Sequence, residues 1–248
     1  MEEKTLVVIP TYNEEENIQP LVQEIFKFAP KVSLLFVDDQ SKDQTRAKIS
    51  EASAKFPGQI NILKRSKKLG LGSAYIAGFQ WGLSNGFQVL IEMDADLSHN
   101  PKYLPNVLKQ LQKNDVVICS RYVDDGGTKD WGLIRRVVSR FGSFYARFIL
   151  GFRVMDFTGG FNAWHARVLK SIKLEDIESN GYVFQIELKY RAILSGFSFK
   201  EIPIIFADRQ KGESKMSLSI VFEAIYMVFL LRLRRSLHTQ ELSLNERG

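Results

Sequence analysis

The first 120 residues alternate between short apolar runs and longer segments of helical periodicity. The apolar runs are rich in Val, Ile and Leu, and they lie at Leu6–Ile9, Leu34–Val37, Ile60–Leu63, Val89–Met93 and Val116–Cys119. Runs of this kind are typical of strands buried on both faces of a parallel sheet. The helical segments between them are Glu15–Phe28, Thr45–Lys55, Gly72–Ser84 and Lys102–Lys113. This alternation predicts an α/β fold with a mostly parallel central sheet flanked by helices.

The second half of the chain is less regular and contains one long amphipathic segment. Leu133–Leu150 has helical spacing, with a stripe of apolar residues and with Arg136, Arg140 and Arg147 largely off it. A second helix is expected at Phe184–Leu194, and a strand is expected at Phe199–Phe206.

A strongly apolar segment, Leu218–Leu231, follows and ends in the basic run Arg232–Arg235. It is shorter than the ~20 residues that a membrane-spanning helix needs. A core helix, a partner-binding helix and an interfacial anchor all fit this pattern. The sequence has no repeat or obvious linker, so we expect one catalytic domain over residues 1–217, followed by an amphipathic helix and tail over 218–248.

The charge distribution distinguishes the two halves. The net charge is +6, and the whole excess lies beyond residue 120, because residues 1–120 contain equal numbers of basic and acidic residues. Five arginines and no acidic residue lie between Trp131 and Met155. This segment favours an anionic partner such as a phosphorylated substrate, phospholipid head groups or nucleic acid. The alternative interpretation is that these arginines form a charged face exposed to solvent.

Hydrophobic residues make up 45% of the chain, enough for one sizeable core. The single cysteine, Cys119, cannot form an internal disulfide, so nothing indicates an oxidising compartment. The N-terminal residues are acidic and lead directly into an apolar run, which is not the pattern of a secretory signal. An intracellular location is expected.

Polar and acidic residues follow four of the predicted strands. They are Pro10–Glu14, Asp38–Ser41, Asp94–Asp96 and Ser120–Arg121. Ligands of open α/β sheets bind at the carboxyl ends of the strands. Asp94 and Asp96 could present oxygens to one hard divalent cation and its diphosphate ligand, although an isolated Asp-x-Asp is more often turn chemistry. The acidic pair Asp38–Asp39, expected at the same edge, favours the metal site.

Other common nucleotide and catalytic motifs are absent from the sequence. There is no GxxxxGK[ST] loop, no GxGxxG after the first strand, and no HExxH, CxxC or GxSxG. Lys68–Gly72 has the glycine spacing of a weak phosphate-binding nest, and a plain helix start is the favoured reading. His99 and His165 are isolated and are expected to be structural.

Several ordered motifs resemble glycosyltransferase family 2, whose members have the GT-A nucleotide-sugar fold. They are Ile9–Glu14, Val37–Ser41, Gly70–Ala74 and Met93–His99. Further motifs resemble the polyprenol-phosphate (dolichol-phosphate) mannose synthases of that family: Ser120–Tyr122, Gly126–Gly127, Trp131, Arg135–Arg140, Thr158–Phe161, Gly181–Glu187, Ile202–Ile204, Arg209, Gly212 and Ser214–Ser217. The resemblance covers roughly residues 5–220. The chain departs from the family pattern at Asp125, where a third glycine is common, and at Asn162, where arginine is common.

The resemblance implies a role for each matching residue. The nucleotide sugar, GDP-mannose, would be bound by Pro10, Tyr12, Glu14, Val37, Asp39, Asp94, Ala95, Asp96, Arg209 and Lys215. Asp94 and Asp96 would hold Mg²⁺ or Mn²⁺. The lipid phosphate would be bound by Arg121, Arg135 and Ser139, because guanidinium groups match phosphate oxygens. Catalysis would rest on Asp94, Asp96 and Arg121, and Gln210–Ser217 would form a closing loop.

The implied reaction is transfer of mannose to a polyprenyl (dolichyl) phosphate with inversion at the anomeric carbon. A phosphate monoester is already anionic near pH 7, so this acceptor needs no general base. Three alternatives stay open: the same fold using UDP-glucose or another nucleotide sugar, a glycan-extending family 2 transferase, and a catalytically silent or nucleic-acid-binding protein. The last is disfavoured because no groove-reading helix is recognisable and because Asp94 and Asp96 are present.

A polyprenyl acceptor lies in a bilayer, yet no segment here is long enough to span one. The two amphipathic segments, Leu133–Leu150 and Leu218–Arg235, combine apolar stripes with arginines. They predict a peripheral protein at the cytoplasmic face of a membrane, held directly by these segments or by a small membrane subunit docking on the second. The competing expectation is that Leu218–Leu231 completes the core.

Overall fold

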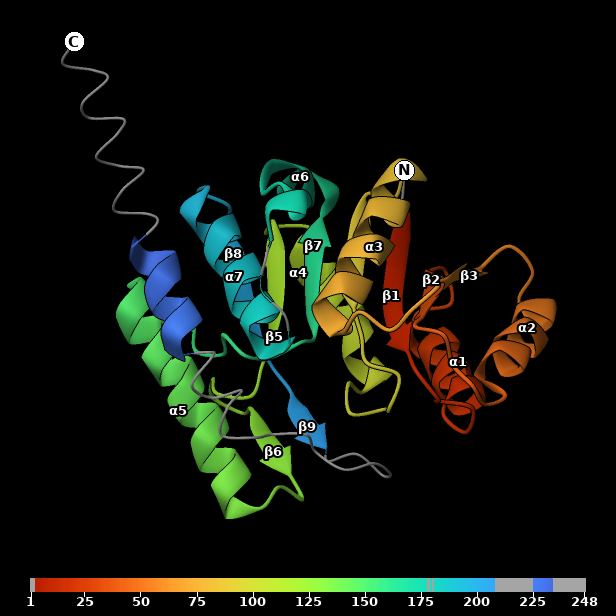
Figure 1. Ribbon diagram of the computed structural model, residues 1–248, viewed down its shortest axis with the longest axis horizontal. Coiled ribbons are helices and arrows are strands. Elements are labelled where there is room, and N and C mark those ends of the chain that lie inside the picture. The colour runs from red at the N-terminus through yellow and green to blue at the C-terminus, as the bar shows by residue number, and fades with distance from the viewer. Residues whose placement is uncertain (1–2, 178, 180, 208–224, 234–248) are drawn as a thin grey trace, which may run out of the picture.

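A seven-stranded sheet forms the centre of the protein, which the computed structural model describes over residues 3–177, 179, 181–207 and 225–233 (Figure 1). The strands are β1 (Thr5–Thr11), β2 (Ser33–Asp38), β3 (Ile60–Lys64), β4 (Val89–Glu92), β5 (Val116–Ser120), β7 (Asn162–His165) and β8 (Phe199–Pro203). The helices are α1 (Ile18–Phe28), α2 (Thr45–Lys55), α3 (Leu71–Ser84), α4 (Leu104–Leu111), α5 (Leu133–Leu150), α6 (Ala166–Ser171) and α7 (Gly181–Leu194), with short 3₁₀ turns η1 (Pro101–Tyr103) and η2 (Leu174–Asp176).

The strand order is β3-β2-β1-β4-β7-β5-β8. Every pairing is parallel except those of β7, which runs antiparallel to both β4 and β5. The mostly parallel α/β sheet predicted from the apolar runs is therefore confirmed. The sequence pattern did not indicate β7, because this four-residue strand carries the polar residues Asn162 and His165 at its ends.

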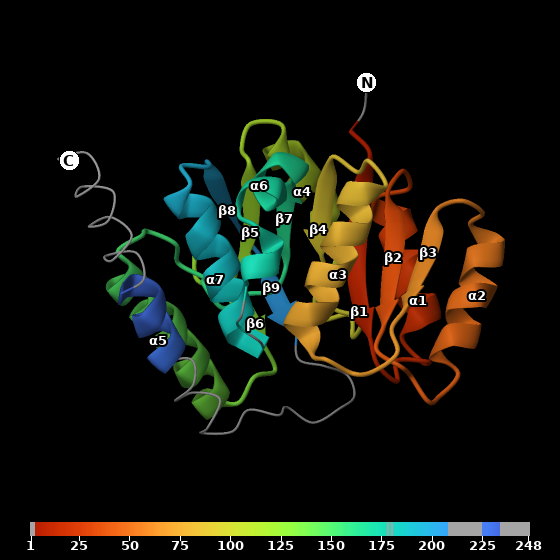
Figure 2. The same ribbon diagram turned by 45° about the horizontal axis from the view of Figure 1, so that its top comes forward.

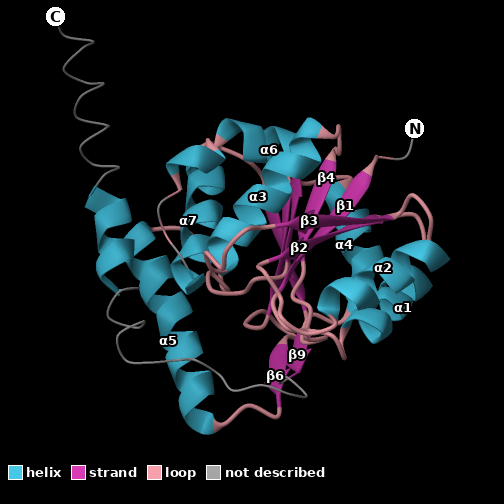
Figure 3. Cartoon of the chain, turned by 45° about the vertical axis from the view of Figure 1, so that its right-hand side comes forward, coloured by secondary structure: helices cyan, strands magenta, loops and turns pink. Residues whose placement is uncertain are grey.

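Helices cover both faces of the sheet in two layers (Figures 2 and 3). One core cluster joins the sheet to α3, α6 and α7, and the other joins it to α1, α2 and α4. The strands alternate their side chains between these clusters, as Val7 and Val8 of β1 show. Burial on both faces explains why the strands read as continuous apolar runs.

Helix α3 packs closely on β1 and β2 because Gly78 lacks a side chain. A Cβ at this position would lie 2.3 Å from Cγ1 of Val8 and 3.1 Å from Cγ2 of Val37. We predict that Gly78→Ala lowers the free energy of unfolding by about 2 kcal/mol through overpacking. Chemical denaturation measures this loss, and Ser84→Ala, at an exposed position of the same helix, is the control. An unchanged denaturation midpoint in Gly78→Ala would contradict this packing.

A small parallel sheet extends beyond the central one and is formed by β6 (Gly127–Lys129) and β9 (Ile205–Ala207). The single strand predicted at Phe199–Phe206 is therefore wrong, because β8 and β9 belong to different sheets. The break follows Pro203, the last residue of β8, which is an edge strand of the central sheet and so tolerates a residue without an N–H. After the break, the Ile204 amide donates to the carbonyl of Ser120 at 3.0 Å.

Helix α5 has the bounds that its periodicity predicted, and it lies at one end of the molecule (Figure 1). The side turned to the protein carries Ser143, Ala146 and Leu150, which are buried. The opposite side exposes an apolar stripe, formed by Leu133, Ile134, Val137, Phe141, Phe144 and Phe148. The apolar face of this helix is thus left uncovered by the described part of the chain.

The helical residues 225–233 lie beside α5 (Figures 1 and 2). The Tyr145 hydroxyl of α5 donates to the carbonyl of Ile225 at 3.1 Å. Val228 and Leu231 are buried in the core cluster of α3 and α7, whereas Tyr226, Phe229 and Leu233 are exposed. Ile225, Met227 and Leu230 are half-buried. The described part of this segment thus contributes both to the core and to the exposed surface.

The predicted domain boundary at residue 217 lies outside the described residues. Within the described residues, no helix is long and apolar enough to cross a membrane.

Candidate active site

The carboxyl ends of β1, β2 and β4 lie at one edge of the sheet, side by side. These strands are parallel neighbours, so the residues that follow Thr11, Asp38 and Glu92 meet at that edge. Strand β5 ends at the same edge, but the antiparallel β7 separates it from β4. Among the described residues, those predicted to bind the nucleotide therefore form one contiguous group, and Arg121 lies beyond β7, at the end of β5.

The loops after β1 and β2 are tied together. The Asn13 amide donates to Ser41 Oγ at 3.0 Å, and the Lys42 amide donates to Asn13 Oδ1 at 2.9 Å. Asn13 has a φ of 59°, which turns the chain at this point. The predicted residues Pro10, Tyr12 and Glu14 are all partly exposed beside this turn.

Cationic residues lie beside Tyr12 and Asp39, two of the predicted nucleotide-sugar residues. The Lys68 ammonium lies 3.5 Å from the centre of the Tyr12 ring. Asp39 forms an ion pair with Arg65, with 2.7 Å between Oδ1 and Nη1, and it accepts from the Leu69 amide at 3.2 Å. These contacts fix the loop that leads into α3.

The two residues before Asp39 have buried side chains. Asp38 is fully buried, and its carboxylate accepts from Arg46 Nε at 2.5 Å. Val37 has no exposed surface and packs towards Gly78. Val37 was among the expected nucleotide-binding residues, and the structure corrects this for its side chain, which the core encloses. Ala95 is also buried, so only backbone atoms of these two residues can face a ligand.

Asp94 and Asp96 are held by a tight turn after β4. The Tyr75 hydroxyl donates to Asp94 Oδ1 at 3.0 Å, and Asp96 Oδ1 accepts from the amide and the hydroxyl of Ser98. The Asp94 amide donates to Nδ1 of His99 at 2.9 Å. Nδ1 is thus an acceptor, and a neutral His99 carries its proton on Nε2, 3.8 Å from Asp94 Oδ2. Burial and the charge of Asp94 raise the pKa of Tyr75, which keeps this hydroxyl a donor.

The chemistry of the Asp94 and Asp96 turn suits a hard divalent cation. Both groups are oxygen donors at a strand end, and the Asp94 side chain is 23% exposed, so it can be reached from solvent. No cluster of three or more metal-ligating His, Cys, Asp or Glu side chains occurs among the described residues. A cation here would therefore complete its coordination with oxygens of a bound ligand.

A buried polar layer lies beneath this turn. The Asn162 side-chain amide donates to Glu92 at 2.7 Å and to Gln185 at 2.9 Å. Lys189 of α7 is fully buried and donates to the carbonyls of Phe157 and Gly159. Burial raises the pKa of Glu92 and lowers that of Lys189, because it penalises the charged form of each. Asn162, a departure from the family pattern, is thus an internal residue.

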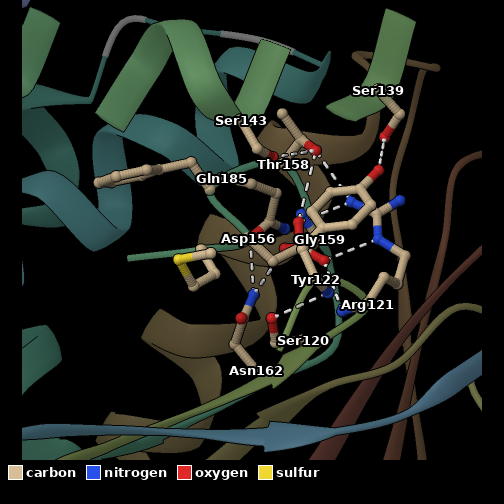
Figure 4. Close-up of polar contacts among 12 residues, drawn as sticks. Ser120, Arg121, Tyr122, Ser139, Ser143, Asp156, Thr158, Gly159, Asn162 and Gln185 are labelled. Carbon is tan, nitrogen blue, oxygen red and sulfur yellow. Dashed lines mark hydrogen bonds and ion pairs between the residues drawn. The ribbon is translucent and has the colours of Figure 1, made fainter. Parts of the chain in front are cut away.

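Arg121, at the end of β5, forms a buried ion pair with Asp156 (Figure 4). Its Nε and Nη2 atoms each lie 2.7 Å from a carboxylate oxygen of Asp156, and Nη2 also donates to Thr158 Oγ1 at 2.8 Å. Asp156 was not among the expected site residues. The one sequence signal for it is that Asp156 is the first acidic residue after the arginine-rich segment.

The other two predicted phosphate-binding residues lie on α5. The Ser139 hydroxyl accepts from Tyr122 at 2.7 Å (Figure 4). Arg135 stacks on the indole of Trp131, with 4.0 Å between its guanidinium carbon and the ring centre. The guanidinium carbon of Arg121 lies 5.5 Å from the same ring. Both arginines therefore gather around Trp131.

An aromatic cluster connects the carboxylates to these arginines. His99 stacks on Phe161 with 5.1 Å between ring centres, and Phe206 meets the edges of both His99 and Trp131 at 5.4 Å. Asp94 contacts this cluster at His99, and Arg121 contacts it at Phe206. Asp94 and Arg121 therefore lie in one region of the structure. The remaining predicted residues, Arg209 and Lys215, and the predicted closing loop Gln210–Ser217 lie outside the described residues.

Comparison with known proteins gives a family match and two close sequence relatives. Residues 6–173 match the family model of glycosyl transferase family 2. The chain is 44% identical over 227 residues to polyprenol monophosphomannose synthase of Mycolicibacterium smegmatis, covering 91% of this chain and 86% of that protein. It is 43% identical over 225 residues to undecaprenyl-phosphate mannosyltransferase of Micrococcus luteus, covering 91% and 92%.

Solved structures show the same fold at low sequence identity. A mannosyltransferase of Pyrobaculum calidifontis in complex with GDP-Man and Mn²⁺ superposes with a TM-score of 0.65 at 16% identity, covering 95% of this chain and 65% of that one. Glucosyl-3-phosphoglycerate synthase of Mycobacterium tuberculosis, with Mn²⁺ and UDP, also gives 0.65 at 18% identity, covering 93% and 80%. The fold is therefore that of the GT-A glycosyltransferases.

Proposed function

The chain belongs to glycosyl transferase family 2 and is a glycosyltransferase, and from this premise we propose that it transfers mannose from GDP-mannose to a polyprenyl phosphate. The observation that carries the proposal is the identity above 40%, over most of both chains, to two enzymes whose names state mannose transfer and a polyprenyl phosphate. The strand-end carboxylates and the arginines around Trp131 suit a donor with a diphosphate and an acceptor with a phosphate.

The proposed donor site is the rim formed by the ends of β1, β2 and β4. Tyr12, Glu14 and Asp39 would contact the nucleoside, together with the backbone of the other predicted residues. Asp94 and Asp96 would hold Mg²⁺ or Mn²⁺, which would offset the negative charge of the departing nucleoside diphosphate. Arg209 and Lys215, outside the described residues, are proposed to neutralise the same phosphates.

The proposed acceptor site lies between the end of β5 and α5, where Arg121, Arg135 and Ser139 would bind the lipid phosphate. Its second pKa is about 6, so near pH 7 the phosphate oxygen is anionic and needs no base to attack the anomeric carbon. In-line attack opposite the leaving diphosphate inverts the configuration and gives a β-linked polyprenyl-phosphate mannose. The enzyme's own task is to hold two anionic substrates close together.

Transfer assays with matched donors test this proposal. Wild-type protein with Mn²⁺ is given a short polyprenyl phosphate and radiolabelled GDP-mannose, UDP-glucose or UDP-N-acetylglucosamine. We expect lipid-linked product from GDP-mannose alone. Product from UDP-glucose alone would assign the other donor, and product on a free glycan but not on the lipid phosphate would overturn the acceptor.

Arg135 separates the two proposed phosphate sites. Removing its guanidinium should weaken acceptor binding, because a charge-assisted phosphate contact contributes about 1.5–3 kcal/mol. We therefore predict that Arg135→Ala raises the acceptor KM at least about tenfold, while calorimetry shows little change in GDP-mannose affinity. Arg136→Ala, at the neighbouring exposed arginine, is the matched control. Loss of GDP-mannose affinity in Arg135→Ala would reverse the assignment of the two sites.

The membrane surface is the proposed location of the reaction, at its cytoplasmic face. The apolar stripe of α5 is exposed to an extent that is unusual for a water-facing helix, with Ile134 81% and Phe148 75% exposed. Arg136 and Arg140 flank it, and Tyr226, Phe229 and Leu233 extend the exposed apolar surface onto the adjacent segment. This combination suits insertion of α5 into the head-group region of an anionic bilayer. A small anchoring subunit that binds the same surface is the alternative.

A further inference from the structure

We propose that Asp156 is a positioning residue for the acceptor, because it fixes the guanidinium of Arg121 in the orientation that receives the lipid phosphate. The inference rests on the proposed function and deepens it. Arg121 is expected to contact the phosphate, whereas Asp156 would act only through Arg121.

The contact between the two residues fixes both the backbone and the side chain of Arg121 (Figure 4). Oδ2 of Asp156 accepts from the backbone amide of Arg121 at 2.9 Å and from Nε at 2.7 Å, and Oδ1 accepts from Nη2 at 2.7 Å. A two-point contact between a planar guanidinium and a carboxylate sets the plane of the arginine as well as its place. Arg121 is 7% exposed and Asp156 is fully buried, so the pair is shielded from water.

Asp156 is itself held from three directions. The Gly159 amide donates to Oδ1 at 2.9 Å, and a Cβ at Gly159 would lie only 3.2 Å from the carboxylate. The backbone amide of Asp156 donates to Glu201 of β8 at 3.0 Å. Lys189 donates to the carbonyls on both sides of Thr158, which fixes the loop that follows Asp156. These bonds leave the carboxylate a single position.

The carboxylate is also held in its charged form. Burial by itself would raise the pKa of Asp156, but the charge of Arg121 and its hydrogen bonds outweigh burial and lower this pKa to about 2. The carboxylate of Asp156 therefore stays charged near neutral pH. A phosphate that approached Arg121 would meet a guanidinium that is already oriented, and pre-organised groups of this kind bind without a further ordering cost.

The same network reaches α5, the helix that carries the other proposed acceptor residues. Thr158 Oγ1, which accepts from Arg121, lies 3.1 Å from Ser143 Oγ on α5 (Figure 4). Ser139, one turn earlier on α5, is bonded to Tyr122, the residue after Arg121. Asp156 therefore contacts the end of β5 directly and is connected through Thr158 to α5, the helix that carries Arg135 and Ser139.

A double-mutant cycle with kinetics for both substrates tests the inference. Four proteins are compared: wild type, Asp156→Asn, Arg121→Gln and the double variant. Asp156→Asn should raise the acceptor KM or lower kcat about 10- to 100-fold, because misplacement of a binding group by about 1 Å has effects of this size. GDP-mannose affinity by calorimetry should change less than about twofold, and the double variant should be no worse than Arg121→Gln alone.

Asp115→Asn is the matched control, because Asp115 pairs with Arg167 near the other end of β5 and should leave both substrates unaffected. If Asp156→Asn does not fold, Thr158→Val, which removes the second acceptor of Nη2, takes its place and should shift the acceptor KM in the same direction. Three outcomes would each overturn the positioning role. The first is a double variant whose loss of activity equals the product of the two single losses. The others are an equal fall in GDP-mannose affinity, and an unchanged acceptor KM and kcat in the folded single variant. A wild-type protein inactive with every polyprenyl phosphate and donor would instead reject the proposed function.

Discussion

Replacing Asp96 by asparagine should lower kcat by about 10³-fold or more while the protein stays folded. Asp96 Oδ1 accepts from the amide and hydroxyl of Ser98, and the asparagine carbonyl can keep both bonds. The turn after β4 should therefore survive, while the negative charge and one of the two oxygens offered to a cation are lost. Asp96→Ala should also abolish transfer. The measurement is sugar transfer at saturating Mn²⁺, with circular dichroism and a melting curve for each variant.

The controls separate the loss of a metal ligand from general damage. Glu51→Gln removes an exposed carboxylate on α2, far from the site, and should leave kcat unchanged. EDTA should inactivate the wild type, and added Mn²⁺ or Mg²⁺ should restore it. Full activity in EDTA, or in folded Asp96→Asn, would show that the two aspartates do not serve a cation.

The arrangement of the proposed donor residues could be predicted because its signals are local. Apolar runs identified β1, β2 and β4, and the residues that follow buried parallel strands must meet at one edge of the sheet. Asp94 and Asp96 were placed at this edge in this way, and their role as metal ligands stays a prediction. The same reasoning included Val37, whose side chain is buried, because position in a motif does not say which way a side chain faces.

The arrangement of the proposed acceptor residues depends on contacts between distant residues, and the sequence showed only part of it. Asp156 lies 35 residues from Arg121, and no local pattern links them. Strand β7, which separates β4 from β5, is short and has polar ends, so its antiparallel insertion was not foreseen. His99 was expected to be structural, and the structure shows what it supports: it fixes the turn of Asp94 and joins the aromatic cluster.

Periodicity predicted the length and the apolar stripe of α5, but it could not say whether the stripe would be covered. The structure turns the small face, with Ser143, Ala146 and Leu150, inward and leaves the aromatic face outside. A helix packed by small residues can lie close to the loops of Arg121 and Tyr122. The acceptor phosphate and the acceptor's lipid chain could then meet opposite faces of one helix.

Replacing Phe141 and Phe148 together by aspartate should therefore detach the protein from anionic vesicles. Both side chains are more than half exposed on the apolar stripe of α5, so the change should not disturb the core. Losing two partly buried phenylalanines and adding two negative charges near an anionic surface should weaken binding by about 3 kcal/mol or more, roughly 10²-fold. Flotation with phosphatidylglycerol vesicles measures this change.

A charge-matched double variant, Leu194→Asp with Asn106→Asp, adds two negative charges at exposed positions of other helices and should float like the wild type. Transfer to a short, water-soluble polyprenyl phosphate should stay near wild type in both double variants, because neither touches Arg121, Arg135 or Ser139. Transfer to a long acceptor embedded in vesicles should fall only in the α5 variant. If the wild type does not float either, the exposed stripe does not bind lipid by itself, and a membrane protein that covers it becomes the better explanation.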